Sequence, residues 1–292
     1  MSLRPLGRNL WLGSLMKKVC LWIIFFFGLV TTAKAYFLVV IQEKGGGYAT
    51  RGEKVSWLVF RGEPFQGLVQ DLITPKAFVR TPQGGKDPVA FTVIELKDYK
   101  TGKKRHAFYV RYTPTEIGDY YLCLLSQKTY IPELNEVWRE ITKVPLHVES
   151  EKAWEIPVGL ELEIVPLTRP YGLTTGQIFR GKVFSQGVPA SHVLVQITHY
   201  HGLFLPWESL PKDTYGKLDR PLMYLSLYTD ENGTFSVAFN QPGWWLISAR
   251  VPQGFVTLAN QRFPLFLRGS LWLYVRPPFI PQGSFPKIVP TP

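Results

Sequence analysis

Alternating apolar and polar positions recur along the chain, and this pattern predicts β-strands. Phe235, Val237 and Phe239 alternate with small or polar residues, which is the period of two expected for a half-buried strand. Asn232-Gly233 precedes this strand and supplies the positive φ angles that a two-residue hairpin turn needs. Pro242-Gly243 then ends the strand before the next apolar run. We therefore expect a hairpin with its hinge at Asn232-Gly233 and its close at Pro242-Gly243.

Short apolar or alternating runs bounded by Gly, Pro and polar turns occupy most of the chain after residue 35. The expected strands are 36–41, 55–60, 77–80, 91–96, 107–112, 120–125, 143–148, 160–167, 176–184, 192–199, 222–228, 234–239, 244–247, 254–258 and 270–275. One short helix is expected at 132–141. Strands of this length and spacing are typical of antiparallel β-sandwiches. The predicted fold class is therefore all-β.

The N-terminal 35 residues have the three regions of a signal peptide. Lys17 and Lys18 precede an apolar run of about a dozen residues, and Ala33-Lys34-Ala35 follows as a cleavage pattern. Met16 is the expected start codon. The apolar run is shorter than the roughly 20 residues of a spanning helix. We expect a periplasmic or secreted chain, and the alternative is an uncleaved segment that anchors it to the inner membrane.

The remaining chain divides into two predicted domains. Residues 36–150 form an N-terminal β-sandwich, 151–159 a polar linker, 160–276 a C-terminal β-sandwich and 277–292 a Pro-rich tail. Both sandwiches are expected to be immunoglobulin-like or prealbumin-like. Gly118-Asp119-Tyr120 resembles a Gly-x-Tyr motif of immunoglobulin-like domains, in which a Tyr hydroxyl ties a corner to the backbone. In the second domain, Glu161 and Glu163 alternate with apolar residues, which predicts a strand with one face in water.

Charge and cysteine content exclude several classes of protein. Removal of residues 1–35 takes away five basic residues and leaves 28 basic and 22 acidic ones, so the charge falls from +11 to +6. Scattered basic residues, with one cluster at 103–106, do not predict nucleic-acid binding. Cys20 leaves with the signal peptide, so Cys123 has no intramolecular disulfide partner and is expected to be a buried core residue.

Several short motifs resemble the exported nickel/cobalt-transport-associated family, whose members carry a NikM-subunit-like domain of unknown function. They lie at 162–173, 179–183, 187–193, 229–235 and 242–245, with weaker matches at 63–65 and 138–148. The resemblance implies a periplasmic accessory component of divalent-metal uptake with no enzymatic role. It also implies an inner-membrane metal transporter as partner and a nickel or cobalt ion as ligand. Members carry His after signal cleavage and in a Gly-His-Pro-Phe motif, whereas this chain has Tyr36 and Glu63 at those positions.

His199-Tyr200-His201 is the remaining candidate for a metal site. If the strand continues through residue 202, a period of two places both imidazoles on one face, where they could chelate Ni²⁺ or Co²⁺. Glu208 is the expected third ligand, with Asp213 as another source of oxygen. The alternative is that both His simply lie at a solvated strand end.

Two further classes of function are an enzyme and a binding module with no metal role. The sequence contains no nucleophile elbow, zincin motif or phosphate-binding loop, so we expect no enzyme. The alternative to metal uptake is an exported carbohydrate- or protein-binding β-sandwich with no metal role, in which aromatic side chains stack on the partner. Its candidate residues are Trp207, Trp244, Trp245 and Trp272.

Overall fold

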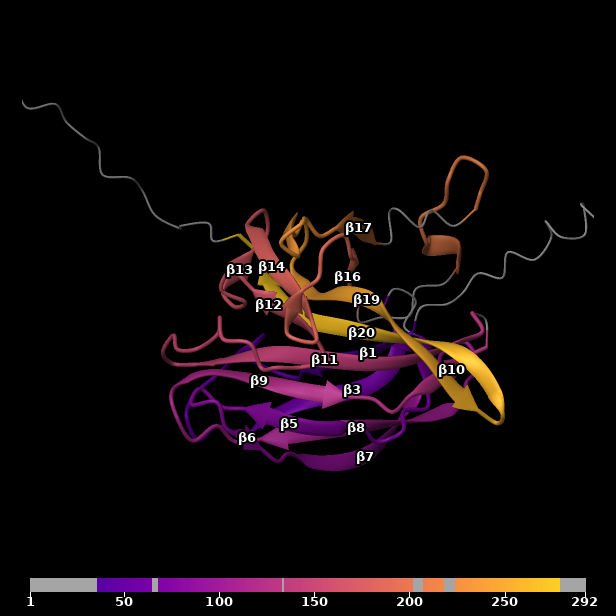
Figure 1. Cartoon of the computed structure of the whole chain (residues 1–292). Helices are drawn as coiled ribbons and strands as arrows, with labels where there is room; N and C mark the ends of the chain where they lie inside the picture. The colour runs from indigo at the N-terminus through magenta and orange to yellow at the C-terminus, as the bar shows by residue number, and fades with distance from the viewer. Residues whose placement is uncertain (1–35, 65–67, 133, 202–206, 218–223, 279–292) are drawn as a thin grey trace, which may run out of the picture. The chain divides into compact units, whose positions relative to one another are not determined.

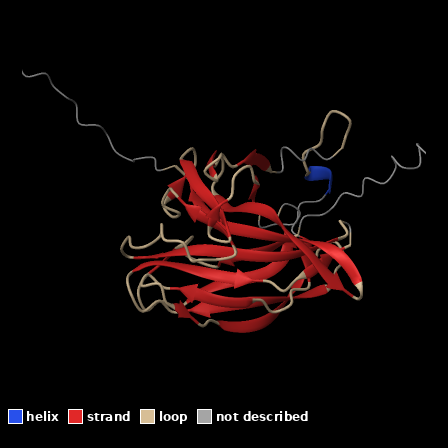
Figure 2. Cartoon of the chain, viewed as in Figure 1, coloured by secondary structure: helices blue, strands red, loops and turns tan. Residues whose placement is uncertain are grey.

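The computed structural model describes residues 36–64, 68–132, 134–201, 207–217 and 224–278 (Figure 1). The predicted signal peptide, most of the Pro-rich tail and parts of the 202–221 excursion lie outside the described residues. Within them, the regular structure is β-strand apart from one 3-10 turn, η1 (Trp207–Ser209), as Figure 2 shows. The all-β fold class is confirmed.

A five-stranded antiparallel sheet is formed by the first half of the chain. Its order is β1 (Phe37–Gln42), β3 (Val55–Glu63), β8 (Lys104–Tyr112) and β7 (Ala90–Lys97), with β4 (Leu68–Gln70) also paired to β3. A four-stranded antiparallel sheet is formed by the second half. It contains β12 (Leu162–Pro166), β14 (Ile178–Ser185), β15 (Val188–Pro189) and β18 (Thr234–Ala238).

A larger sheet combines strands from both halves of the chain. Its order is β17 (Leu225–Tyr228), β16 (Leu194–His199), β19 (Gly243–Leu258), β20 (Gln261–Arg276), β11 (Glu136–Val148), β9 (Gly118–Leu125), β5 (Lys76–Arg80) and β6 (Lys86–Asp87). β2 (Tyr48–Ala49) and β10 (Thr129–Ile131) pair with β11, and β13 (Leu173–Thr174) pairs with β20. β11 and β20 run parallel and are in register from Val137↔Leu265 to Lys143↔Leu271.

Alternate residues of this shared sheet belong to two separate cores. On β9, Leu122 and Leu124 pack into a core with the five-stranded sheet, whereas Tyr121 and Cys123 pack into a core with the four-stranded sheet. Because side chains on a strand point alternately to opposite faces, one sheet can serve both cores. This arrangement explains why the central strands β9 and β11 are buried at almost every position.

The loop at 151–159 separates β11 from β12, so the predicted linker lies between strands of different sheets. The predicted division into two domains stays a prediction. The largest sheet contains strands from both predicted domains, so the two are joined through it. The two cores exchange side chains between the predicted domains. The core of the five-stranded sheet contains Trp244, Leu246 and Trp272, which come from the predicted domain 160–276. The core of the four-stranded sheet contains Ile141, which comes from the predicted domain 36–150.

Two predicted local structures are wrong. The helix expected at 132–141 is not formed, because residues from Glu136 onward lie in β11, where the parallel ladder to β20 satisfies their backbone. The turn at Asn232-Gly233 does form, and Gly233 has a φ of 75°. However, β17 and β18 do not pair with each other across it: β17 pairs with β16 and β18 pairs with β14. The turn therefore connects two sheets and is not the hinge of a hairpin.

The corner predicted at Gly118-Asp119-Tyr120 is confirmed. The Tyr120 hydroxyl donates to the Glu116 carbonyl at 2.8 Å and accepts from the Glu116 N–H at 3.0 Å. Gly118 has a φ of 129°, and a Cβ there would lie 2.7 Å from the Cβ of Pro82. Glycine is therefore required at this start of β9.

The strand that was expected to have one face in water is buried. All five residues of β12 are buried, and the Glu163 carboxylate pairs with Lys143, which is also buried. Glu161 does reach the surface and pairs with Arg139 at 2.6 Å. Glu163 breaks the predicted pattern because its carboxylate accepts a hydrogen bond from the buried ammonium group of Lys143 on β11 and does not face water.

No helix among the described residues is long and apolar enough to cross a membrane.

Candidate functional site

The two imidazoles of the predicted metal site lie next to each other. β16 ends at His199, but the Tyr200 N–H still donates to the Trp244 carbonyl at 2.9 Å, so the chain continues beside β19. The ring centroids of His199 and His201 are 4.9 Å apart, edge to face. Tyr200 packs with Trp272 in the core of the five-stranded sheet. The alternation of strand residues therefore holds through His201.

A backbone carbonyl fixes the ring of His199. Its Nε2 lies 2.9 Å from the Pro242 carbonyl oxygen, and because a carbonyl only accepts, Nε2 carries the proton. The lone pair of the neutral ring is then on Nδ1. Gly243 allows this approach, since a Cβ there would lie 2.8 Å from Nε2. The Pro-Gly pair was predicted as a turn, and its role in orienting His199 was missed.

The second nitrogen of His199 is the unusual feature of the site. Nδ1 is buried and, among the described residues, has no hydrogen-bond partner. The ring is held against Trp245, with centroids 4.8 Å apart. A buried polar atom without a partner costs about 1–3 kcal/mol. A proton donor or a cation at Nδ1 would offset this cost.

Burial favours the neutral form of both rings. It lowers the pKa of His199 below 6.5, and the hydrogen bond to the Pro242 carbonyl opposes this only in part. Burial also lowers the pKa of His201, and the neighbouring His199 lowers it further. Neutral imidazoles are the form that binds metal ions. The lowered pKa values therefore favour two neutral rings at neutral pH.

The predicted oxygen ligands are not gathered around the pair. Glu208 is exposed in η1. Asp213 accepts from the N–H groups of Tyr215 and Lys217, at 2.9 Å each, and so closes its own turn. In the part of the chain that the structure describes, no three His, Cys, Asp or Glu side chains form a group that could hold a metal ion. Among the described residues, the candidate site thus consists of the two imidazole rings of His199 and His201.

The two positions at which the resembling family carries His lie close to His201. The His201 N–H approaches the Pro64 carbonyl at 3.5 Å, directly after Glu63 at the end of β3. The register of β1 and β3 pairs Phe37 with Gly62, which puts Tyr36 beside Glu63. Three segments far apart in sequence therefore meet at one end of β3.

The tryptophans proposed for a carbohydrate-binding surface are mostly core residues. Trp244 and Trp245 are 8% exposed, and Trp272 is fully buried with its Nε1–H donating to the Leu38 carbonyl at 3.0 Å. The side chain of Trp207 lies outside the described part of the structure. Trp244, Trp245 and Trp272 thus form no exposed aromatic platform.

His147 belongs to a buried polar network. Its Nδ1 lies 2.7 Å from the Asp119 carboxylate, and its ring stacks on Tyr171 with centroids 4.0 Å apart. Asp119 also accepts from the Lys152 N–H at 2.7 Å and from the Tyr171 hydroxyl at 3.2 Å. These contacts join β9, β11 and the segment before β13, which is a structural role.

Comparison with solved structures gave several distant likenesses. Trypsin-activated alpha-2-macroglobulin from Escherichia coli is 13% identical with a TM-score of 0.26, over 84% of this chain and 16% of that chain. A DUF4785 family protein from Legionella pneumophila is 11% identical with a TM-score of 0.26, over 72% and 50%. The adhesin InvE from Yersinia pseudotuberculosis is 10% identical with a TM-score of 0.20, over 83% and 61%. This chain thus spans half or less of the length of the alpha-2-macroglobulin and of the DUF4785 family protein.

Comparison with curated proteins found no match. Comparison with protein families gave a match that covers most of the chain, at residues 34–253. The match includes all of the first predicted domain and most of the second, with His199 and His201 inside it. This protein therefore belongs to the family described as "Domain of unknown function (DUF4198)".

Proposed function

We propose that this protein is an exported, non-enzymatic accessory component of divalent-metal uptake, and that it contacts a nickel or cobalt ion through His199 and His201. The observation that carries the proposal is the buried Nδ1 of His199, which has no hydrogen-bond partner among the described residues. Imidazole nitrogens are suitable ligands for both metals.

The hydrogen bonding of His199 supports this role. A ligating imidazole usually donates its other N–H to a carbonyl or carboxylate, which fixes the tautomer and the ring orientation. The hydrogen bond from Nε2 to the Pro242 carbonyl has this form. The ring of His201, 4.9 Å away between centroids, supplies the second nitrogen. Burial lowers the pKa of both rings and so favours the neutral form, which is the form of imidazole that binds metal ions.

Two nitrogen donors suit a protein that presents an ion and does not retain it. The remaining coordination positions would be filled by water or by donors of an inner-membrane transporter, because no third protein ligand lies at the pair among the described residues. A site with few protein ligands binds weakly and can release its ion to a partner that has more donors. Transfer to a transporter requires such release.

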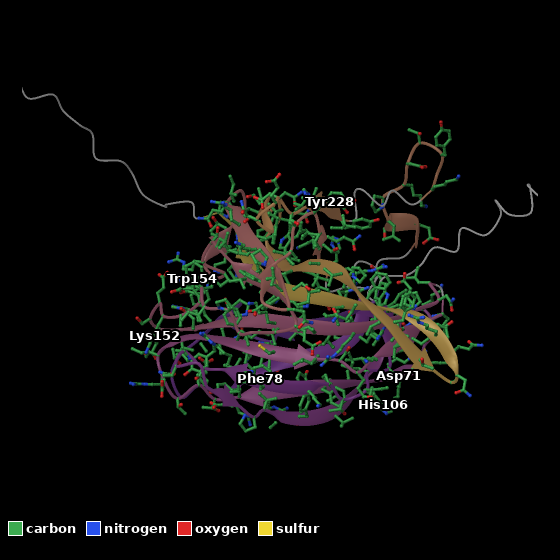
Figure 3. All side chains as sticks on the ribbon, in the orientation of Figure 1. Asp71, Phe78, His106, Lys152, Trp154 and Tyr228 are labelled. Atoms are coloured by element: carbon green, nitrogen blue, oxygen red, sulfur yellow. The ribbon has the colours of Figure 1, made fainter. Side chains whose placement is uncertain are left out.

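Calorimetric titration of the purified protein with Ni²⁺ and with Co²⁺ tests the proposal. We expect saturable binding that is lost in the His199→Ala/His201→Ala variant. The matched control is His106→Gln, which removes an imidazole from β8 next to Asp71, as Figure 3 shows. Equal affinity in the double variant would refute the assignment. An absence of binding to the unmodified protein would favour a binding module with no metal role.

A further inference from the structure

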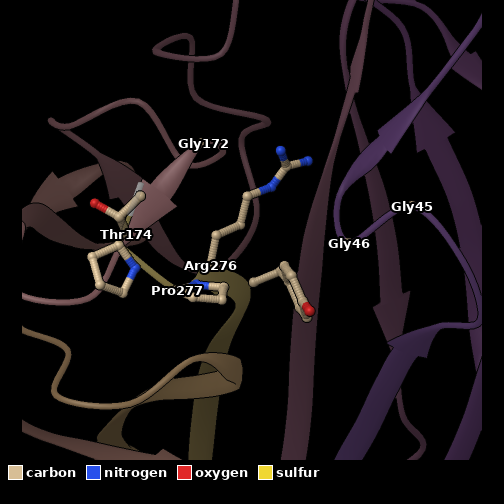
Figure 4. Close-up of a pocket in the computed structure, with 8 residues that line it drawn as sticks. Gly45, Gly46, Gly172, Thr174, Arg276 and Pro277 are labelled. Atoms are coloured by element: carbon tan, nitrogen blue, oxygen red, sulfur yellow. The ribbon is translucent and has the colours of Figure 1, made fainter. Parts of the chain in front are cut away.

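A second candidate site lies at the end of β20, away from the His pair in sequence and formed by different segments. A hollow of about 730 Å³ is lined by Gly45, Gly46, Gly172, Thr174, Tyr274, Arg276, Pro277 and Pro278 (Figure 4). Arg276 is the last residue of β20 and lies opposite Thr174 of β13 in the parallel ladder. Figure 4 shows its side chain extending toward the space between Gly172 and the loop of Gly45 and Gly46.

The charge of Arg276 is not neutralised by a carboxylate of the described residues. Its guanidinium lies over the ring of Tyr48, 4.3 Å from the centroid. The lining of the hollow contains no Asp or Glu. Arg169 is also near, since its Nη2 would lie 3.6 Å from a Cβ on Gly172, and Glu151 pairs with Arg169 at 3.3 Å. The hollow therefore carries the positive charge of Arg276, and the N–H groups of its guanidinium can bind an anion.

The glycines keep the backbone of the hollow open. Gly45, Gly46 and Gly172 have φ angles of 89°, 54° and 66°. A Cβ on Gly46 would lie 2.6 Å from the ring of Tyr274, and one on Gly172 would lie 2.9 Å from the Tyr48 hydroxyl. Among the described residues, the N–H groups of Gly45 and Gly46 have no acceptor. They are backbone donors next to a guanidinium.

We propose that this hollow binds the oxyanion group, carboxylate or phosphate, of a small molecule. A guanidinium forms two parallel hydrogen bonds with either group, and backbone N–H groups add further donors. Tyr48 holds the guanidinium plane by stacking, so Arg276 loses little freedom when the anion binds. Tyr274, Pro277 and Pro278 provide an apolar wall for the rest of the ligand. The proposal does not depend on metal binding.

Titration of the ¹⁵N-labelled protein with inorganic phosphate and, separately, with citrate tests this assignment, with sodium chloride at matched ionic strength as reference. We expect saturable shifts of the Gly45 and Gly46 amide signals with at least one anion and none with chloride. A response to phosphate alone, to citrate alone or to both identifies the oxyanion that the hollow accepts. If neither anion shifts these signals, the proposal is wrong.

Substitution of the arginine provides the second arm of the test. Arg276→Gln should weaken binding at least tenfold. Arg276→Lys, which keeps the charge but not the fork, should weaken it less. The matched control is Arg262→Gln, because Arg262 is an exposed arginine of the same strand that stacks on Phe255 at 4.2 Å. Binding that is unchanged in Arg276→Gln, or weakened equally in Arg262→Gln, would overturn the proposal.

Discussion

The ammonium group of Lys143 lies 2.5 Å from the carboxylate of Glu163, and the two side chains are each 2% exposed. Lys143 is on β11 and Glu163 is on β12, so the pair joins the central sheet to the four-stranded sheet. Glu163 also accepts from the N–H groups of Val158 and Gly159 at 2.9 Å, and Lys143 lies 4.6 Å from the ring centroid of Tyr121. These contacts provide hydrogen-bond and charge partners for both groups in a buried site.

Removal of one partner of this pair should strongly destabilise the protein. Lys143→Met leaves a buried carboxylate without its cation, and the expected loss is about 3–5 kcal/mol of the free energy of unfolding. The double variant Lys143→Met/Glu163→Leu should recover part of that loss, because it buries no charge. Urea denaturation measures both. If the double variant is no more stable than Lys143→Met, the pair does not act as a coupled unit.

The same pair predicts a loss of stability in acid. Burial by itself raises the pKa of Glu163, but the charge and hydrogen bond of Lys143 and the backbone donors outweigh it and lower the pKa below 4.5. A carboxyl with a lowered pKa in the folded state contributes stability above the pKa of the unfolded chain, and this is lost as the pH falls through the folded pKa.

Urea denaturation between pH 3 and pH 6 should therefore show stability falling below about pH 4.5, by up to ~1.4 kcal/mol per pH unit from this group. Glu163→Gln should flatten this part of the profile. Glu208→Gln is the control, because Glu208 is exposed. A profile that Glu163→Gln leaves unchanged would contradict the assignment.

The Tyr120 corner should contribute measurable stability. Tyr120→Phe removes the two hydrogen bonds to Glu116 but keeps the buried ring, so we expect a loss of roughly 1–2 kcal/mol. Tyr130→Phe is the control, because its hydroxyl is exposed and, among the described residues, bonds only the side chain of Asn135. This variant should change stability by less than about 0.5 kcal/mol. Equal losses in both variants would mean that the corner has no special role.

The thiol of Cys123 should be inert in the folded protein. It is fully buried, and burial raises its pKa to about 12, so almost no reactive thiolate is present at neutral pH. Iodoacetamide labelling followed by peptide mass spectrometry should find Cys123 unmodified in buffer and modified in urea. Rapid labelling in buffer would show that the core of the four-stranded sheet opens.

Strands were predictable where the sequence itself records their environment. The alternation of Phe235 and Val237 with polar residues and the Gly-x-Tyr motif at Gly118 are local signals, and β18 and the Tyr120 corner form as expected. Central strands carry less information. β11 is buried on both faces, so its residues show no period that separates a strand from a helix, and the helix expected at 132–141 was wrong for that reason.

Pairing partners could not be predicted from local signals. The turn at Gly233 indicates a change of direction, but not that the strands before and after it join different sheets. Burial of Glu163 depends on Lys143, twenty residues earlier, and no pattern within β12 records that partner. The His pair was predictable because a period of two is local. The carbonyl of Pro242 beside His199 was not, because it comes from the chain before β19.

The central proposal is that His199 and His201 bind a nickel ion together. X-ray absorption at the nickel edge of the loaded protein tests it directly. We predict scattering from two imidazole rings at neutral pH, lost in His199→Ala/His201→Ala and weakened as acid protonates both rings below about pH 6.5. A nickel shell of oxygen atoms alone, or imidazole scattering that persists in the double variant, would contradict the account.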